Sequence, residues 1–156
     1  LFEKELKASG LDYSIIRPNG FFSDMVDFIR MAQRGRGYVF GSGEYRINPI
    51  HGSDLAAVCA DAALNGAYEI EVGGPEIFTH NEILALAFDA CSKPVKISRI
   101  PLWIRDIALK GAKKRMPAGI IGPMEFFMTV MAMDMVAPQT GKYRLSRFFR
   151  EYLSSI

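Results

Sequence analysis

The chain is poor in the residues from which disulfide frameworks and metal centres are built. It has two cysteines and two histidines in 156 residues. Cys59 and Cys91 fall on apolar faces of predicted helices, the usual setting of a buried free thiol. Neither histidine has a cysteine, histidine or carboxylate partner at the spacing of a ligand set, so we predict no metal site. Free thiols suit a reducing compartment, and we expect a cytoplasmic protein.

The chain also lacks an excess of charge of one sign and a long uncharged apolar run. Its formal net charge of +2 is too small to indicate a nucleic-acid partner. The most apolar segment, 120–136, is shorter than the ~20 residues of a membrane span and contains Pro123, Glu125 and Asp134. We therefore expect neither nucleic-acid binding nor a span. The basic run at 110–115 is interpreted as the solvated end of a helix, with a contact to phosphate or acidic lipid as the alternative.

The chain does contain a short apolar run that ends abruptly at a proline. Residues 13–17 read as a buried strand, and Pro18 ends it because proline cannot donate a ladder hydrogen bond. Gly20 has no Cβ, so the backbone after the strand can pass close to another group. Ligands bind at the carboxyl ends of strands in open α/β sheets. The stretch 17–22 is therefore a candidate ligand edge.

Helices and strands alternate along the first two thirds of the chain, which indicates an α/β fold. Helices are predicted at 1–9, 23–33, 102–114, 120–136 and 145–156. Two more are predicted between them: one is capped by Ser53 or Asp54 and ends near 65, and the other follows a capping box at Thr79. The predicted strands are 13–17, 38–40, 45–48, 68–72 and 95–100, of which the second and third suggest a hairpin or a short flap. We divide the chain into 1–100 and a helical part, 101–156.

The order of several short motifs resembles the atypical NAD(P)H-binding branch of short-chain dehydrogenase/reductase-like proteins, the NmrA-like and epimerase/dehydratase-like groups. The stretch 11–22 is similar to their sixth strand and the following turn. The similarity continues through Ser9–Tyr13, Phe40–Gly43, Arg46–Ala56, Val72–Glu76, Thr79, Glu82 and Ile83. Beyond about residue 100 it extends only to a helical cap.

This resemblance implies the carboxyl-terminal part of a Rossmann-like, doubly wound fold with a helical substrate-side cap. Such proteins open with a strand and a Gly-x-x-Gly-x-x-Gly turn that holds the cofactor pyrophosphate, and that turn does not occur here. We therefore expect the carboxyl-terminal half of a longer protein that binds NAD or NADP. The whole protein would oxidise, reduce or epimerise a small organic substrate, and this chain alone would be inactive.

The resemblance also assigns roles to residues after the first strand. Pro18, Asn19, Gly20 and Phe21 match the turn that passes the nicotinamide, although Pro-Asn-Gly can also simply end a strand. The neighbouring residues Phe22 and Met25 would then face the substrate; a place in the core explains them equally well.

Two further residues are candidate substrate contacts. Arg46 corresponds to an arginine that binds a diphosphate in sugar-nucleotide epimerases, and the alternative is an ion pair with Glu44 or a helix end. His51 precedes a helix and could carry a proton, or be purely structural. Asp54 is interpreted as a cap or as a partner of the helix macrodipole, and His80 as an exposed member of a capping box.

No catalytic residue is predicted. Where such proteins have a catalytic pair, a tyrosine is followed four residues later by a lysine, because residues four apart share a helix face. None of the six tyrosines has such a lysine; they are Tyr13, Tyr38, Tyr45, Tyr68, Tyr143 and Tyr152.

The main alternative is a non-enzymatic NmrA-like regulator that senses dinucleotide occupancy and acts through a partner surface. The methionine-rich segment 120–136 and the amphipathic final helix would form that surface, and either could instead join copies in a homo-oligomer. A peripheral membrane or quinone-related role for 120–136 is a third interpretation.

Overall fold

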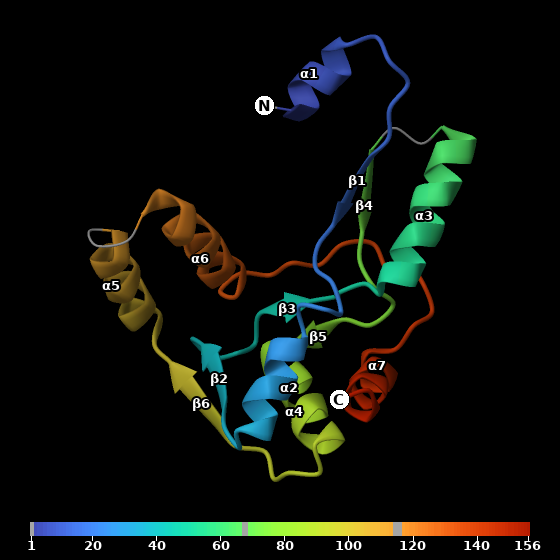
Figure 1. Cartoon of the computed structure of the whole chain (residues 1–156). Helices are drawn as coiled ribbons and strands as arrows, with labels where there is room; N and C mark the ends of the chain where they lie inside the picture. Colours follow the sequence, from blue (N-terminus) through green and yellow to red (C-terminus); the bar gives the residue numbers. More distant parts are fainter. Residues whose placement is uncertain (1, 67–68, 114–116) are drawn as a thin grey trace.

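The computed structural model describes residues 2–66, 69–113 and 117–156, and it has the predicted α/β order (Figure 1). The helices are α1 (Phe2–Ala8), α2 (Val26–Gln33), α3 (Gly52–Asn65), α4 (His80–Ala90), α5 (Leu102–Lys113), α6 (Ala118–Val130) and α7 (Leu145–Ser154). The strands are β1 (Ile15–Pro18), β2 (Gly37–Phe40), β3 (Arg46–Ile47), β4 (Glu69–Val72), β5 (Phe78–Thr79) and β6 (Ile97–Ile100). The predictions that fall on Leu1, Tyr68, Lys114 and Met116 lie outside the described residues.

Two of the three strand pairs are parallel. β1 pairs with β4, with Ile15 opposite Glu69, and β2 pairs with β6, with Gly37 opposite Ile97. β3 and β5 form a short antiparallel pair. Parallel strands require crossover connections, and α2 and α3 both lie between β1 and β4 in the chain. The α/β, Rossmann-like prediction is confirmed.

Of the two interpretations of 38–40 with 45–48, the hairpin is wrong, because β2 and β3 do not pair with each other. The turn between them does reverse the chain, with Gly41 and Gly43 at φ 61° and 76°. However, the start of α4 occupies the place beside this turn, where Asn81 donates to the Ser42 carbonyl at 3.0 Å and its backbone N–H donates to the Gly43 carbonyl at 3.1 Å. β2 therefore pairs with β6, and β3 pairs with β5.

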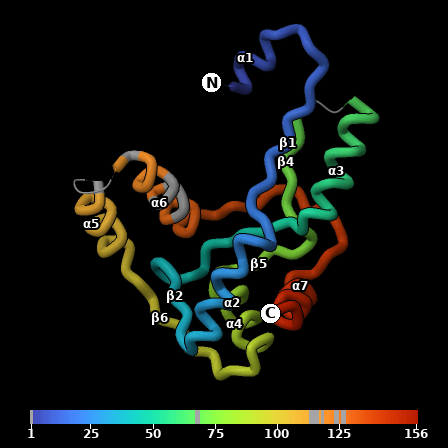
Figure 2. Tube along the Cα trace, viewed as in Figure 1, coloured from blue at the N-terminus to red at the C-terminus, as the bar shows by residue number. Residues whose placement is uncertain are grey.

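The core lies where α2, α4 and α7 meet beside β2, in the lower part of Figure 1. Ile29, Leu84 and Phe149 from the three helices are fully buried there. The β1–β4 pair extends away from this core, with α3 beside it and α1 at its far end, as the trace in Figure 2 shows. The carboxyl end of β1 therefore points toward the core.

The helix predicted at 120–136 ends at Val130. Asp134 accepts a hydrogen bond from the Arg46 backbone N–H at 2.8 Å, and the Met135 N–H donates to the Arg46 carbonyl at 2.7 Å. These contacts with β3 hold the chain extended and thus stop the helix. Among the described residues no helix is both long and apolar enough to cross a bilayer.

Three side-chain predictions are wrong. Cys59 is exposed on α3, whereas Cys91 is half-buried, and burial raises the pKa of its thiol. α3 is capped by His51, whose Nδ1 accepts from the Ser53 N–H at 3.1 Å, and not by Ser53 or Asp54. His80 is buried, because α4 begins inside the core.

The predicted capping box at α4 is confirmed. The Thr79 hydroxyl accepts from the Glu82 N–H at 3.2 Å, and the Glu82 carboxylate accepts from the Thr79 N–H at 2.7 Å. We expect Thr79→Ala to lower the free energy of unfolding by about 1 kcal/mol in urea denaturation. Ser53→Ala, at the other predicted cap, should change it by less than about 0.5 kcal/mol, since His51 caps α3. Equal losses in the two variants would contradict this assignment.

Burial lowers the pKa of His80, and the charge of Asp134 opposes the shift. The unfolded chain, with a histidine pKa of about 6.5, then binds the proton more tightly than the folded chain. The corresponding stability is present above about pH 6.5 and is lost as the pH falls below it. Ring-proton NMR titration of the folded chain should give His80 a pKa below the ordinary value. A titration at or above that value would show that the ring is not buried in solution.

Candidate functional site

The turn after β1 is fixed to the chain around residue 50. The Asn19 N–H donates to the Val72 carbonyl at 3.2 Å and so extends the pairing with β4. The Ile50 N–H donates to the Gly20 carbonyl at 2.9 Å. A Cβ on Gly20 would lie 3.1 Å from Ile47 Cδ1, so the close approach that this glycine permits is to β3. The turn is therefore rigidly placed at the end of the strand.

Asn19 and Asn48, here called the asparagine pair, connect this turn to the segment after α6. Asn48 is fully buried; its Oδ1 accepts from Asn19 Nδ2 at 2.5 Å and from the Ala137 N–H at 3.0 Å, and its Nδ2 donates to the carbonyls of Gly74 and Ala137 at 3.1 and 2.8 Å. Asn19 Nδ2 also donates to the Met135 carbonyl at 2.5 Å. Asn19 Oδ1 is buried and has no hydrogen-bond partner among the described residues.

Two glycines make room for this pair. A Cβ on Gly73 would overlap the Asn48 amide, and a Cβ on Gly74 would overlap the Pro49 carbonyl oxygen. The Gly74 N–H donates to the Asn48 carbonyl at 2.7 Å. The end of β4 and the segment after β3 thus approach more closely than side chains allow. Asn48 was missed by the sequence reasoning, although Gly73-Gly74 directly after a strand was a signal of such an approach.

A groove of about 260 Å³ opens beside the asparagine pair, at the carboxyl ends of β1 and β4, and is here called the strand-end groove. It is lined by Arg17, Pro18, Asn19, Glu71 and residues 134–137. A larger hollow of about 700 Å³ lies between residues 12–16 and α3, on the flank of β1. Because ligands of open α/β sheets bind beyond the carboxyl ends of strands, we take the smaller groove as the candidate site.

Charges surround the groove. The Arg46 backbone N–H, with the Arg46 guanidinium, lowers the pKa of Asp134 and keeps it anionic. Arg17 is engaged by Glu3 at 2.6 Å and Glu69 at 3.0 Å, so its charge is already neutralised. Asp134 is in turn paired with Arg46, and the lining of the groove has one cationic side chain, Arg17, and two carboxylates, Glu71 and Asp134.

The structure separates the predicted cofactor residues from some of the predicted substrate residues. Pro18 and Asn19 line the strand-end groove, and Gly20 and Phe21 continue the turn beside it. Phe22 and Met25 are only 2% and 6% exposed and belong to the core cluster, which is the alternative that the sequence left open. The cofactor and substrate roles of these residues stay predictions.

Arg46 and His51 do not line the groove. Arg46 pairs with Asp134 at 3.3 Å and not with Glu44, because the chain after α6 returns to β3. His51 caps α3 and stacks on Tyr143 with ring centroids 4.3 Å apart, as expected of a structural histidine. Asp54 is buried and accepts from the N–H groups of Lys142 and Tyr143, each at 2.9 Å, so it anchors the segment before α7.

The asparagine pair should dominate the stability of this region. Asn48→Ala removes four hydrogen bonds and leaves buried backbone groups unpaired, and we expect it to lower the free energy of unfolding by about 3 kcal/mol or more. Asn65→Ala, which removes one exposed bond to Asp61, should cost less than about 0.5 kcal/mol. Similar unfolding midpoints in urea for the two variants would contradict the central role of Asn48.

No family model matches the chain, but several curated proteins do. It is 28% identical to divinyl chlorophyllide a 8-vinyl-reductase of Cucumis sativus, over 92% of this chain and 37% of the cucumber protein. It is 30% identical to the Arabidopsis thaliana enzyme of the same name, over 89% of this chain and 36% of that protein. Both relatives are named as chloroplastic. The chain spans about two fifths of the length of these relatives.

Solved structures share the fold. The NADPH complex of an Escherichia coli quinone oxidoreductase superposes with a TM-score of 0.69 at 17% identity, over 97% of this chain and 57% of that one. A nucleoside-diphosphate-sugar epimerase of Staphylococcus aureus superposes with a TM-score of 0.62 at 16% identity, over 95% and 55%. The resemblance to atypical short-chain dehydrogenase/reductase-like proteins is confirmed. The division at residue 100 and the cytoplasmic location stay predictions.

Proposed function

We propose that this chain supplies the nicotinamide edge and part of the substrate pocket of an NAD(P)(H)-binding oxidoreductase. The observation that carries the proposal is the strand-end groove, where a parallel strand pair ends at a turn held by the asparagine pair. In this fold, the carboxyl edge of the sheet is where a dinucleotide binds.

The residues of the groove fit one end of a dinucleotide. A volume of about 260 Å³ is below the range of pockets that enclose a whole drug-sized ligand. Pro18, Met135 and Val136 offer apolar walls to an aromatic ring. Asn19 Oδ1 is buried and has no partner among the described residues, and a carboxamide N–H that reached it from the groove would satisfy it.

The charged side chains of the groove favour the nicotinamide end of a dinucleotide over its phosphates. Glu71 and Asp134 outnumber Arg17 in the lining and disfavour a pyrophosphate, so the phosphates would lie elsewhere. The same carboxylates attract the oxidised nicotinamide ring, which is a cation. The nicotinamide and not the pyrophosphate is therefore the group that suits these residues.

The relatives suggest the reaction class. Their name describes reduction of a vinyl group on a chlorophyllide. Vinyl reduction adds one hydride to one carbon and one proton to the other. We propose that the whole protein reduces a carbon–carbon double bond on a ring substrate, with the hydride delivered at the edge formed by Pro18 and Asn19. The groove beside Met135 and Val136 would meet the apolar part of that substrate.

NMR of the isotopically labelled chain can test this proposal with reduced nicotinamide mononucleotide as the probe. It has the nicotinamide and one phosphate but no adenosine, so it does not require the absent glycine-rich turn. We expect saturable shifts of the backbone amides of Asn19, Gly20 and residues 135–137. Shifts confined to the cationic pocket of Lys142, Arg144 and Arg147 would show phosphate binding alone and would exclude this edge.

Two matched variants sharpen the titration. Val136→Ala shortens a side chain at the groove that is 43% exposed, and should weaken the probe several-fold. Val95→Ala shortens a comparable side chain, 53% exposed, before β6 and should leave the affinity unchanged. Equal affinities for both variants would place the probe away from Val136.

A further inference from the structure

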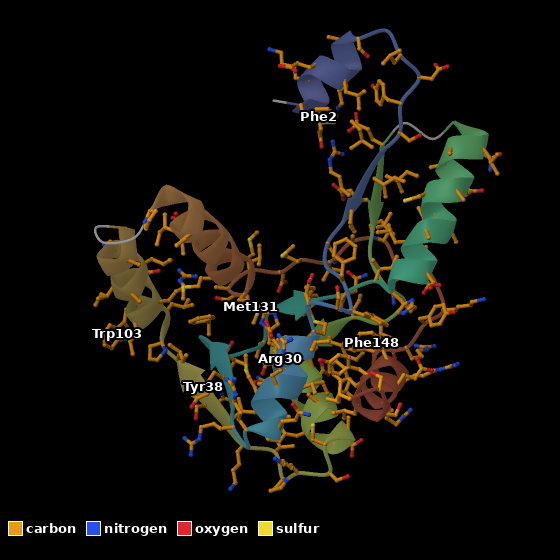
Figure 3. The ribbon with its side chains drawn as sticks, viewed as in Figure 1. Phe2, Arg30, Tyr38, Trp103, Met131 and Phe148 are labelled. Atoms are coloured by element: carbon orange, nitrogen blue, oxygen red, sulfur yellow. The ribbon has the colours of Figure 1, made fainter. Side chains whose placement is uncertain are left out.

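Helix α5 carries three large apolar residues on the outside. Trp103, Ile104 and Ile107 are 63%, 41% and 61% exposed. Residues three and four apart lie on one helix face, so these side chains form a continuous apolar stripe. Figure 3 shows Trp103 on the side of α5 that faces away from α6. An exposed apolar stripe of this kind marks an interaction surface.

The inner face of α5 shows that this orientation is fixed by packing. α5 packs on α6, and Arg105 lies in that interface, with its side chain only 19% exposed. Arg105 donates to Asp106 at 2.7 Å and reaches the Met128 carbonyl at 3.5 Å. An arginine on the inner face holds the apolar residues outward.

The neighbouring strands extend the exposed aromatic surface. β6 leads into α5 through Pro101, and Tyr38 on β2 is opposite Ser98 on β6. The Tyr38 ring is 46% exposed, and Figure 3 shows it on the same flank as Trp103. Tryptophan and tyrosine are the residues that favour the boundary between lipid and water.

Positive charge is concentrated in the segment of the sequence that contains this stripe. Residues 93–115 contain eight of the chain's 19 lysines and arginines but only one of its 17 acidic residues. The rest of the chain is therefore net negative. On the described part of this segment, Lys96, Arg99 and Lys110 are exposed, and Lys110 follows Ile107 by three positions along the stripe. The segment unites apolar, aromatic and cationic groups.

We propose that the outer face of α5 binds the surface of an anionic lipid membrane. Trp103 and the two isoleucines would enter the headgroup boundary, and the lysines and arginines would pair with lipid phosphates. In this arrangement α5, Leu102–Lys113, lies on the membrane surface and does not cross the bilayer. Self-association through this stripe is disfavoured, because a two-fold interface would place the same cationic segment on both sides.

The single tryptophan makes the binding directly measurable. Trp103 is the only tryptophan in the chain, so its fluorescence reports on this stripe alone. Vesicles with equal parts of phosphatidylcholine and phosphatidylglycerol should shift its emission to the blue and sediment the chain, whereas phosphatidylcholine alone should do neither. No shift with the mixed vesicles, or equal binding to both, would overturn the proposal.

Variants separate the apolar and the charged contributions. Ile107→Ser should weaken sedimentation with the mixed vesicles about tenfold, and Leu64→Ser, at an 84% exposed residue of α3, should not change it. Lys110→Gln should weaken it about fivefold, and Lys4→Gln on α1 should not. Lipid docking at this face would be overturned if the control variants lost as much binding as the test variants. It would also be overturned if Trp103 became buried with rising protein concentration in the absence of vesicles.

Discussion

The hydrogen bonds of Asn48 hold together the segments on which the site depends. Its buried side-chain amide accepts hydrogen bonds from the turn after β1 and from the chain after α6, and it donates to the end of β4 and to the chain after α6. These segments are 26 to 89 residues from Asn48 in the sequence, so local structure cannot hold them together. A buried amide with all partners in place fixes one arrangement, because any shift leaves a polar group unpaired. The strand-end groove has its shape for this reason.

The same constraint explains why small residues surround the pair. Gly73 and Gly74 lie where a Cβ would collide with Asn48 or Pro49, and Gly20 lies against Ile47. Without these glycines the strand ends could not come close enough for the amide to reach three segments. Gly20 at the candidate edge is therefore needed for the packing of the protein itself. A ligand would bind to a turn that is already formed.

The sequence predicted the elements better than their pairing. The capping box at Thr79 and the end of α3 near residue 65, where Gly66 follows with a positive φ, depend on local signals, and both are confirmed. The hairpin prediction was wrong because the pairing of these strands depends on Asn81, which is far along the chain and lies beside the turn. The end of α6 was missed for the same reason, since only the distant Arg46 backbone draws Asp134 out of the helix. The exposed face of α5 was likewise invisible, because an amphipathic pattern does not say which face a neighbour will cover.

The two proposed surfaces are parts of one continuous stretch of chain. β6 leads into α5, α5 into α6, and the residues after α6 become the wall of the strand-end groove. That wall is fixed by Arg46, Asn19 and Asn48, so it stays in place when the packed helices α5 and α6 meet another surface. With α5 on a lipid surface, α6 and the segment after it would connect that surface to the proposed nicotinamide edge. This connection gives a physical reason for an apolar stripe to face outward at this point of the fold.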